Sequence, residues 1–574
     1  MQEIAVDTPH FRTHDNFTYR KYNGFVMQLG ISKSVSKKQK ESALIMRKQT
    51  KIAAVVSAAA LLALGASMTS FAASKGTWMM VDGEWYCYDK NGDAYENTFC
   101  SSNGKEYYVG DDGQLVRSAW VEYDGDHYFV NSSGAKITND WRLTTPYDDD
   151  SADEEWYYFQ STGKMATNKK IAYKNKTYFF DSEGQMLTGW VTYSTEGTAN
   201  VDEANDFDPS ETYYCDETGA RVEKDWIKST EPSVEDDDAD ADEYWYYFKS
   251  SGKAQTGKGT NIKGQTYLFD TEGRMLTGWV AGSKSDVDNK MRYAEIGGED
   301  STVELHECKG GDVYFCGDED DGHAKKNKWF KTWKPSTYDD ADEDNDEYWY
   351  WIDKDGKVFI PSDSNAAKGH KYKLTDAELE DKATLTSINK KKVNSKDYFF
   401  NQDGEMLSHF IEVTTASGDL QSGMYYFGGD DDGSMKTGSQ SIKDDNGDTY
   451  KFYFGTKSTS GYDKKGVGIT GNKSNKLYYK GLLITADDYK YQIADVEGKK
   501  FIVNKNGSIQ HSNVEYKDDD EVIIDAKNVA VKYVTTGADQ WKYSIDEAAS
   551  DLDKANKKET ISLDVMKNTG KVVE

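Results

Sequence analysis

The chain has 574 residues, and 100 Asp and Glu against 70 Lys and Arg give it a net charge of −30. So acidic a surface repels nucleic acid and anionic lipid headgroups, which argues against a phosphate-rich polymer as the main partner. Hydrophobic residues make up only 37%, yet the chain contains 40 Tyr and 14 Trp. Because disordered chains are poor in aromatics, this composition predicts an ordered β fold with a large surface.

Residues 46–72 have the layout of a secretory signal peptide. Basic residues open the segment, an apolar run follows at 52–64, and small residues lead to Ala72. We expect cleavage after Ala72, secretion of the mature chain and no membrane insertion afterwards. Residues 1–45 show no clear apolar periodicity, so we interpret them as a non-native upstream extension, with an unusually long signal start as the alternative.

Five cysteines in a secreted chain leave at least one outside any intramolecular pairing. Cys87, Cys215 and Cys316 stand at or beside strand positions where other units carry Tyr or Phe. We therefore interpret them as small apolar side chains rather than as a disulfide framework. No C-x-x-C spacing occurs, which argues against a structural zinc site.

From residue 73 to about residue 510, the chain repeats a short aromatic phrase. W-Y-Y-F occurs at 156–159 and again at 245–248, and Y-W-Y-W occurs at 348–351. Alternating aromatics between turn residues predict β-hairpins, and an isolated hairpin is only marginally stable in water. The predicted fold is therefore all-β, a solenoid of roughly a dozen stacked β-hairpins over residues 73–510.

A longer period contains the short one. Trp156 and Trp245 are 89 residues apart, and so are Tyr178 and Tyr267. Three successive hairpins therefore form one copied unit. The copies begin near three tryptophans, which are Trp141, Trp226 and Trp329.

Two segments depart from the repeat. The third copy has an insertion at 361–387, where T-D-A-E-L-E-D-K predicts a helical stretch with Thr375 as its N-cap. In 511–574 the aromatic phrase fades, and we predict either a small capping module or a loosely ordered end. This tail has no His after His511, which argues against an enzyme hidden there, and it has no sorting motif that would predict anchoring.

The first hairpin of each copy has an acidic insert, at 147–155, 235–244 and 338–348. Alternate carboxylates in the third insert could surround a calcium ion, which takes six to eight oxygen ligands. These candidate ligands are Asp340, Asp342, Asp344 and Asp346. The inserts lack the glycine-centred spacing of a calcium loop, so solvated hairpin tips are the alternative.

No convergent set of catalytic residues is evident. The eight His are scattered, and H-E-x-x-H, G-x-S-x-G and phosphate-loop motifs are absent from the sequence. Carboxylates are abundant, but a glycosidase pair needs a shaped cleft, and carboxylates massed in polar turns are usually solvated. We therefore predict a protein without a catalytic domain.

The pattern W-V-x-x…Y-Y-F-x-x-x-G-x-M-x-T-G-W resembles the cell-wall-binding repeat family, which includes choline-binding modules and glucan-binding repeats. The resemblance covers most of the chain after residue 72. It implies β-hairpins that wind as a left-handed superhelix. It also implies shallow ligand sites between neighbours, each walled by two Trp of one hairpin and an aromatic residue of the next.

Transferred to this sequence, the resemblance predicts one aromatic cage for each copied unit and one near the start of the repeats. The cage residues are Trp141, Trp156 and Tyr178; Trp226, Trp245 and Tyr267; Trp329, Trp349 and Tyr398; and Trp78, Trp85 and Tyr107. Other hairpins carry a different residue where the second Trp should stand, namely His127, Thr177, Thr266 or Asp397. We therefore expect three or four complete sites rather than a dozen.

A ring face attracts a quaternary ammonium by about 0.5–2 kcal/mol, and flat rings also stack on the apolar face of a sugar. The predicted partner is thus a bacterial cell-wall or surface polymer, either choline-bearing or glucan-like, held at many weak sites by a secreted, non-covalently attached protein. In a thin solenoid the same rings also form the core, so the alternative is an adhesin or interaction scaffold whose aromatics are structural. The methionines after the turn glycines are expected to fill the core; they are Met165, Met186, Met275 and Met406.

Overall fold

The computed structural model describes most of the chain from Phe71 to Ser562. The described residues are 71–72, 76–201, 208–209, 211–232, 242–298, 301–308, 312–337, 346–362, 366–375, 378–456, 462–549, 552–558 and 560–562. They belong to two compact units, the first made of residues up to 206 with 211–222, the second of 207–210 with residues from 223 onward. None of the described residues lies in a helix long and apolar enough to cross a membrane. The predicted signal segment 46–72 falls outside the described residues except for its last two.

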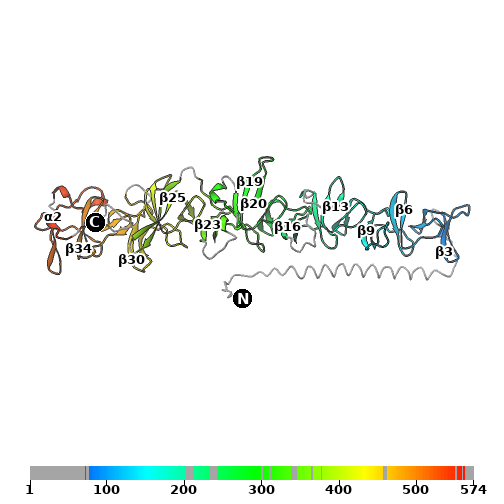
Figure 1. Cartoon of the computed structure of the whole chain (residues 1–574), viewed down its shortest axis with the longest axis horizontal. Coiled ribbons are helices and arrows are strands. Elements are labelled where there is room, and N and C mark those ends of the chain that lie inside the picture. Colours follow the sequence, from blue (N-terminus) through cyan, green and yellow to red (C-terminus); the bar gives the residue numbers. More distant parts are fainter. Residues whose placement is uncertain are drawn as a thin grey trace, which may run out of the picture. The chain divides into compact units, whose positions relative to one another are not determined.

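The first unit consists of short antiparallel strands (Figure 1). Its strands are β1 (Phe71–Ala72), β2 (Thr77–Val81), β3 (Glu84–Tyr88), β4 (Thr98–Ser102), β5 (Lys105–Val109), β6 (Ala119–Tyr123), β7 (Asp126–Val130), β8 (Asp140–Thr144), β9 (Glu155–Phe159), β10 (Lys169–Tyr173), β11 (Lys176–Phe180), β12 (Gly189–Tyr193), β13 (Thr198–Asn200) and β14 (Thr212–Cys215). Most pair as two-stranded hairpins; β1 adds to β2 and β3, and β12 lies between β13 and β14.

The second unit continues with hairpins and then forms broader sheets. Its strands are β15 (Asp225–Ser229), β16 (Tyr244–Phe248), β17 (Gly257–Ile262), β18 (Gln265–Phe269), β19 (Trp279–Lys284), β20 (Met291–Glu295), β21 (Asp312–Phe315), β22 (Lys328–Thr332), β23 (Tyr348–Ile352), β24 (Ala367–Thr375), β25 (Glu378–Val393), β26 (Lys396–Phe400), β27 (Phe410–Thr415), β28 (Gly423–Tyr426), β29 (Gly438–Lys443), β30 (Thr449–Phe454), β31 (Gly471–Lys473), β32 (Lys476–Tyr479), β33 (Leu482–Leu483), β34 (Tyr491–Val496), β35 (Lys499–Asn504), β36 (Ile509–Gln510), β37 (Glu515–Asp518), β38 (Glu521–Asp525) and β39 (Ile561–Ser562). Short 3-10 turns lie at Leu305–Glu307, Pro335–Thr337, Asp539–Trp541 and Glu547–Ala549, and α2 (Leu552–Ala555) is the one α-helix in the part of the chain described. The all-β prediction is confirmed.

The hairpin of β10 and β11 illustrates how the repeat folds. Its strands pair over five residues, and the two-residue turn between them is Lys174–Asn175, with φ of +48° and +64°. Positive φ at both central residues is the type I′ geometry, whose twist matches that of the flanking strands. At the next turn Gly184 has a φ of +81°, the left-handed conformation that glycine adopts without steric cost.

Within each unit, neighbouring hairpins are joined by backbone hydrogen bonds. Met165 forms a β-bridge with Phe159 of its own hairpin, and its N–H donates to the carbonyl of His127 in the preceding hairpin at 2.9 Å. Met186 donates in the same way to Trp156, also at 2.9 Å. Each turn after a hairpin therefore attaches it to its predecessor, so the hairpins stack. The left-handed winding of the stack stays a prediction.

The helix predicted in the 361–387 insertion is wrong. Thr375 ends β24, and β25 begins at Glu378, so the two strands form a hairpin in which Thr375 pairs with Glu378. β24 also pairs with β27 and joins a five-stranded sheet. The helix does not form because strand pairing on both sides of β24 satisfies the backbone hydrogen-bonding groups of this segment.

The C-terminal segment shares a core with the β34–β35 hairpin. Ile493 and Ile502 pack with Tyr516, Ile523 and other buried residues of the tail. Trp541 and Tyr543 pack against the neighbouring cluster that contains Leu477 and Phe501 of the last hairpins. We interpret residues 511–562 as a cap that covers the last apolar face of the second unit.

The cysteines behave as the sequence predicts. Cys87 and Cys316 are completely buried, and Cys215 is 1% exposed. Burial raises the pKa of the Cys215 and Cys316 thiols, so both stay protonated at neutral pH. They therefore act as small apolar side chains in the cores of their hairpins.

Candidate ligand-binding sites

The strand register brings two tryptophans of one hairpin to the same face. Trp141 of β8 lies opposite Tyr158 of β9, and Trp156 lies opposite Leu143. Leu143 and Trp141 are two residues apart on one strand, so their side chains share a face, and Trp156 is the diagonal neighbour of Trp141. The two indole centroids are 6.3 Å apart at 82°.

A tyrosine of the next hairpin forms the third wall. Tyr178 of β11 meets Trp141 edge-on, with ring centroids 4.8 Å apart at 71°. Met186 follows in the next turn, is half-buried and packs against the cluster of Tyr158 and Tyr178. We call Trp141, Trp156, Tyr178 and Met186 the Trp141 site.

The same geometry recurs one copy later, in the second unit. Trp226 is 6.4 Å from Trp245 at 86° and 4.8 Å from Tyr267 at 66°. The N–H of Met275 donates to the Trp245 carbonyl at 2.8 Å, as Met186 does to Trp156. We call these four residues the Trp226 site. Two tryptophans and a tyrosine thus take equivalent positions in both copies, and the methionine backbone makes the same bond to the second tryptophan.

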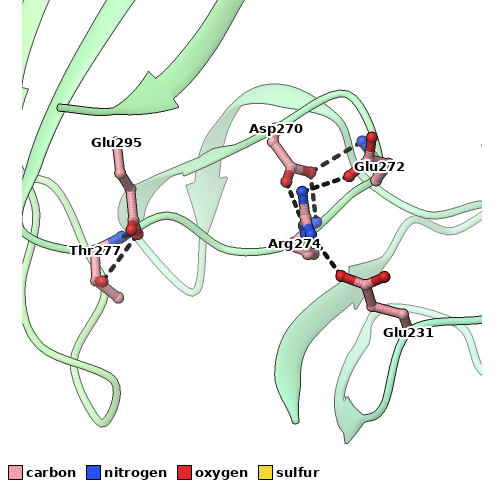
Figure 2. A network of polar contacts seen from close by, with 6 residues as sticks. All are labelled: Glu231, Asp270, Glu272, Arg274, Thr277 and Glu295. Carbon is pink, nitrogen blue, oxygen red and sulfur yellow. Dashed lines mark hydrogen bonds and ion pairs between the residues drawn. The ribbon is translucent and has the colours of Figure 1, made fainter. Parts of the chain in front are cut away.

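An arginine fixes the loop that supplies Met275. Arg274 donates from Nε to Asp270 and from Nη1 to Glu231, both at 2.6 Å, and it also pairs with Glu272 (Figure 2). Burial opposes the charge of Arg274, but the hydrogen bond and the attraction of Asp270 outweigh it and raise its pKa. The backbone next to Met275 is therefore held by several charge-assisted contacts.

The third copy differs in the polar contact of its second tryptophan. Trp329 meets Tyr398 at 4.7 Å and Trp351 at 5.4 Å, and Trp351 takes the place that Tyr158 has opposite Trp141. Trp349 is half-buried, and its indole N–H donates to Oδ1 of Asp431 at 3.0 Å. Met406 donates its N–H to the Trp349 carbonyl at 2.9 Å. The Trp329 site, formed by Trp329, Trp349, Tyr398 and Met406, therefore has a carboxylate at its edge.

At the site near the start of the repeats, the first tryptophan is more deeply buried than Trp141, Trp226 or Trp329. Trp78 is only 4% exposed and meets Tyr107 at 5.8 Å and 72°. Trp85 packs against the same cluster, and Leu115 takes the place of the methionine, donating its N–H to the Trp85 carbonyl at 2.8 Å. We call these four residues the Trp78 site. The strand register places Trp349 on the same face as Trp329, and the other predicted cage residues contact one another within their groups; ligand binding at the four groups stays a prediction.

The predicted core role of the methionines holds in part. Met165 is 6% exposed and belongs to the cluster of Phe129 and Tyr157. Met186, Met275 and Met406 are half-buried, and Met186 and Met406 pack against the aromatic clusters of their sites. The sequence pattern did not predict this contact with the rings.

The aromatic rings that form the sites are uncharged. Burial raises the pKa of each wall tyrosine, so its ring remains a neutral phenol at any physiological pH; these residues are Tyr107, Tyr178, Tyr267 and Tyr398. A neutral, electron-rich face attracts a cation and also accepts the apolar face of a sugar. The sites can therefore bind ligands but contain no pair of groups arranged for proton transfer.

Two of the three acidic inserts, at 235–244 and 338–348, lie mostly outside the described residues. The described insert at 147–155 is largely exposed, as expected for a solvated tip. Asp340, Asp342 and Asp344 are not described, and Asp346 is exposed. Elsewhere in the described chain, Glu304, His306 and Asp403 place three potential metal ligand atoms within 4.8 Å of one another. His306 Nδ1 is already 2.6 Å from Asp403, so this group is satisfied as a hydrogen-bonded pair.

Fold and sites together define a protein of β-hairpin repeats with groups of aromatic rings between neighbouring hairpins. Residues 151–190 match the family described as a choline-binding repeat, and residues 240–254 and 391–406 match the family described as a putative cell wall binding repeat. These segments contain residues of the Trp141, Trp226 and Trp329 sites. These segments are therefore similar to choline-binding and cell wall binding repeats.

Similar proteins share only part of their length with this chain. Glucosyltransferase-S of Streptococcus mutans serotype c is 26% identical over 273 residues, which are 47% of this chain and 14% of that protein. A putative endo-beta-N-acetylglucosaminidase of Streptococcus pneumoniae serotype 4 is 30% identical over 97 residues, 16% of this chain and 14% of the relative. The chain thus matches only a small part of each of these proteins.

Solved structures of choline-binding proteins also match. Choline binding protein F of Streptococcus pneumoniae is 17% identical, and the match covers 72% of this chain and 98% of that chain with a TM-score of 0.26. The modular autolysin LytC of the same species is 17% identical over 58% of this chain and 53% of that chain, with a TM-score of 0.31.

Proposed function

We propose that this protein binds a polymer of the bacterial surface through the Trp141, Trp226, Trp329 and Trp78 sites, without catalysing a reaction. The observation that carries the proposal is the repeated set of two Trp, one Tyr and one Met or Leu at equivalent register positions. A structural core alone would not require the same four side-chain types at each site. The protein is secreted and attaches non-covalently to the wall.

The ligand we propose is a quaternary ammonium group such as choline carried by the polymer. Three ring faces supply about 3–5 kcal/mol in total, which corresponds to a dissociation constant near the millimolar range. A polymer with many ammonium groups is then held by several sites at high effective concentration. The related Glucosyltransferase-S favours a second candidate, a glucan stacked on the same rings.

Tryptophan fluorescence of the full chain separates these ligands. We expect a saturable change with millimolar choline chloride, no change with sodium chloride at equal ionic strength, and little change with isomalto-oligosaccharides. Retention on isolated cell walls should be reversed by free choline. A response to the oligosaccharide alone would favour the glucan. No response to either ligand, together with no retention on walls, would leave the scaffold interpretation.

A further inference from the structure

One interface between hairpins already contains a cation from the chain itself. It lies between the β4–β5 and β6–β7 hairpins and consists of Phe99, Glu106, Tyr128 and Lys136. The ammonium of Lys136 is 4.7 Å from the centroid of Phe99 and 5.3 Å from that of Tyr128. It also forms an ion pair with Glu106, and the Lys136 side chain is only 9% exposed. We call this group the Lys136 interface.

The register makes this interface equivalent to the Trp141 site. Phe99 lies opposite Tyr108 as Trp141 lies opposite Tyr158, so Phe99 holds the place of the first tryptophan. Glu106 lies opposite Ser101, the place of the second tryptophan.

The other two walls correspond as well. Tyr128 lies opposite Val121 as Tyr178 lies opposite Ile171. The N–H of Lys136 donates to the Glu106 carbonyl at 2.7 Å, the bond that Met186 makes to Trp156.

We infer that the Lys136 interface is a ligand site closed from within, where the lysine ammonium takes the position that an external ammonium takes in the Trp141 site. This inference rests on the proposed function. The physical reason is that the carboxylate of Glu106 and two ring faces favour a cation, and the side chain that reaches them is covalently attached. A tethered cation has a high effective concentration, so a free ligand at millimolar concentration does not displace it.

Two further interfaces without a second tryptophan hold a cation in a similar way. Lys258 stands at the place of the first tryptophan, with its ammonium 4.6 Å from the ring centroid of Tyr314 and 2.9 Å from its hydroxyl. Arg221 takes the methionine place, and its guanidinium carbon is 5.4 Å from the centroid of Tyr213. The wall tyrosines of these two interfaces thus already face a positive charge, as Tyr128 does at the Lys136 interface.

A ligand-independent experiment tests the closure on the native chain. Reductive methylation should modify Lys136 at least about tenfold more slowly than Lys105, an exposed lysine of the β4–β5 hairpin, as read by peptide mass spectrometry. Glu106→Gln should speed the reaction at Lys136 and leave Lys105 unchanged. Equal rates at the two lysines in the native chain would overturn the inference, whether or not the protein binds choline.

A second experiment opens the interface. The double variant Glu106→Trp with Lys136→Met restores two walls of a complete site, and equilibrium dialysis should then detect one additional choline per chain. Lys105→Met is the matched control and should bind as the native chain does. A folded double variant with unchanged stoichiometry, beside a native chain that binds choline, would overturn the inference. If the native chain binds no choline while Lys136 is protected, the proposed function fails and the internal closure stands.

Discussion

Trp349 donates its indole N–H to Asp431 at 3.0 Å, and Asp431 also pairs with Lys331 at 3.3 Å. These two residues are 82 positions apart in the sequence, so the loop after β28 returns to the Trp329 site. No residue of the copied pattern predicts this carboxylate. It provides the Trp329 site with a negative charge beside its rings, which complements a cationic ligand.

Asp431→Asn should weaken choline binding at the Trp329 site by about two- to fivefold, because an exposed carboxylate adds a modest attraction to a cation. 5-Fluorotryptophan NMR resolves the site, with the Trp349 resonance assigned from Trp349→Phe. The Trp156 and Trp245 resonances in the same sample are the control. Equal affinity at Trp349 in both proteins would exclude a role for the carboxylate in binding.

The same carboxylate predicts a pH dependence. Hydrogen bonds from Trp349 and Lys331 lower the pKa of Asp431. A lowered folded-state pKa means that the contact is fully present above the ordinary Asp value and is lost as pH falls through the lowered one. The Trp349 resonance should therefore shift only in acid, below pH ~4. In Asp431→Asn this acid transition should be missing.

Trp156→Ala should remove the Trp141 site at a limited cost in stability. The ring is half-buried, so we expect a loss of about 1–3 kcal/mol in the free energy of unfolding and the disappearance of one choline site. Thr177→Ala changes the equivalent register position of the next hairpin and should leave choline stoichiometry unchanged.

Trp279→Ala separates packing from binding. Trp279 is 1% exposed and donates its indole N–H to the Trp333 carbonyl at 3.0 Å. Its removal should cost about 3–5 kcal/mol without removing a site. Chemical denaturation followed by circular dichroism measures the loss in the free energy of unfolding for Trp279→Ala and for Trp156→Ala. A cost for Trp156→Ala equal to that for Trp279→Ala would mean that Trp156 serves mainly as core.

Gly219→Ala should disturb the Trp141 site from outside. Gly219 has a φ of +75°, and a Cβ there would meet Sδ of Met186. We expect a strain of roughly 1–2 kcal/mol from the left-handed backbone, and weaker choline binding because Met186 is pushed toward the rings. Gly104→Ala is the matched control, since its φ is +74° and nothing lies within 4 Å of its added Cβ. If both variants bind choline equally well, Met186 is not a wall of the site.

Arg274→Gln should loosen the Trp226 site. The variant leaves Asp270, whose side chain is 13% exposed, without its ionic partner, so we expect about 1–3 kcal/mol of lost stability. Affinity at the Trp245 resonance should fall, because the backbone that positions Met275 is less constrained. Lys290→Gln removes an exposed charge that pairs weakly with Asp288 at 3.9 Å and should change neither quantity.

Much of the fold followed from local sequence. Alternating aromatics between turn residues predicted the hairpins. The helix assigned around Thr375 failed because pairing with β27 is a long-range contact that a local pattern does not contain. The Met walls were missed for a similar reason, since each reaches the preceding hairpin rather than its own.

The sequence by itself determined the hairpins, their copied order and the tryptophans that distinguish complete sites, because strand alternation and turn chemistry act over a few residues. Tertiary structure alone decided which charged side chains lie against the rings of each interface. The position of Asp431 beside Trp349 and of Lys136 between Phe99 and Tyr128 depends on stacking between hairpins. From sequence alone Lys136 reads as an ordinary surface lysine. Only the packing of two hairpins places its ammonium between two rings, where a ligand cation would lie.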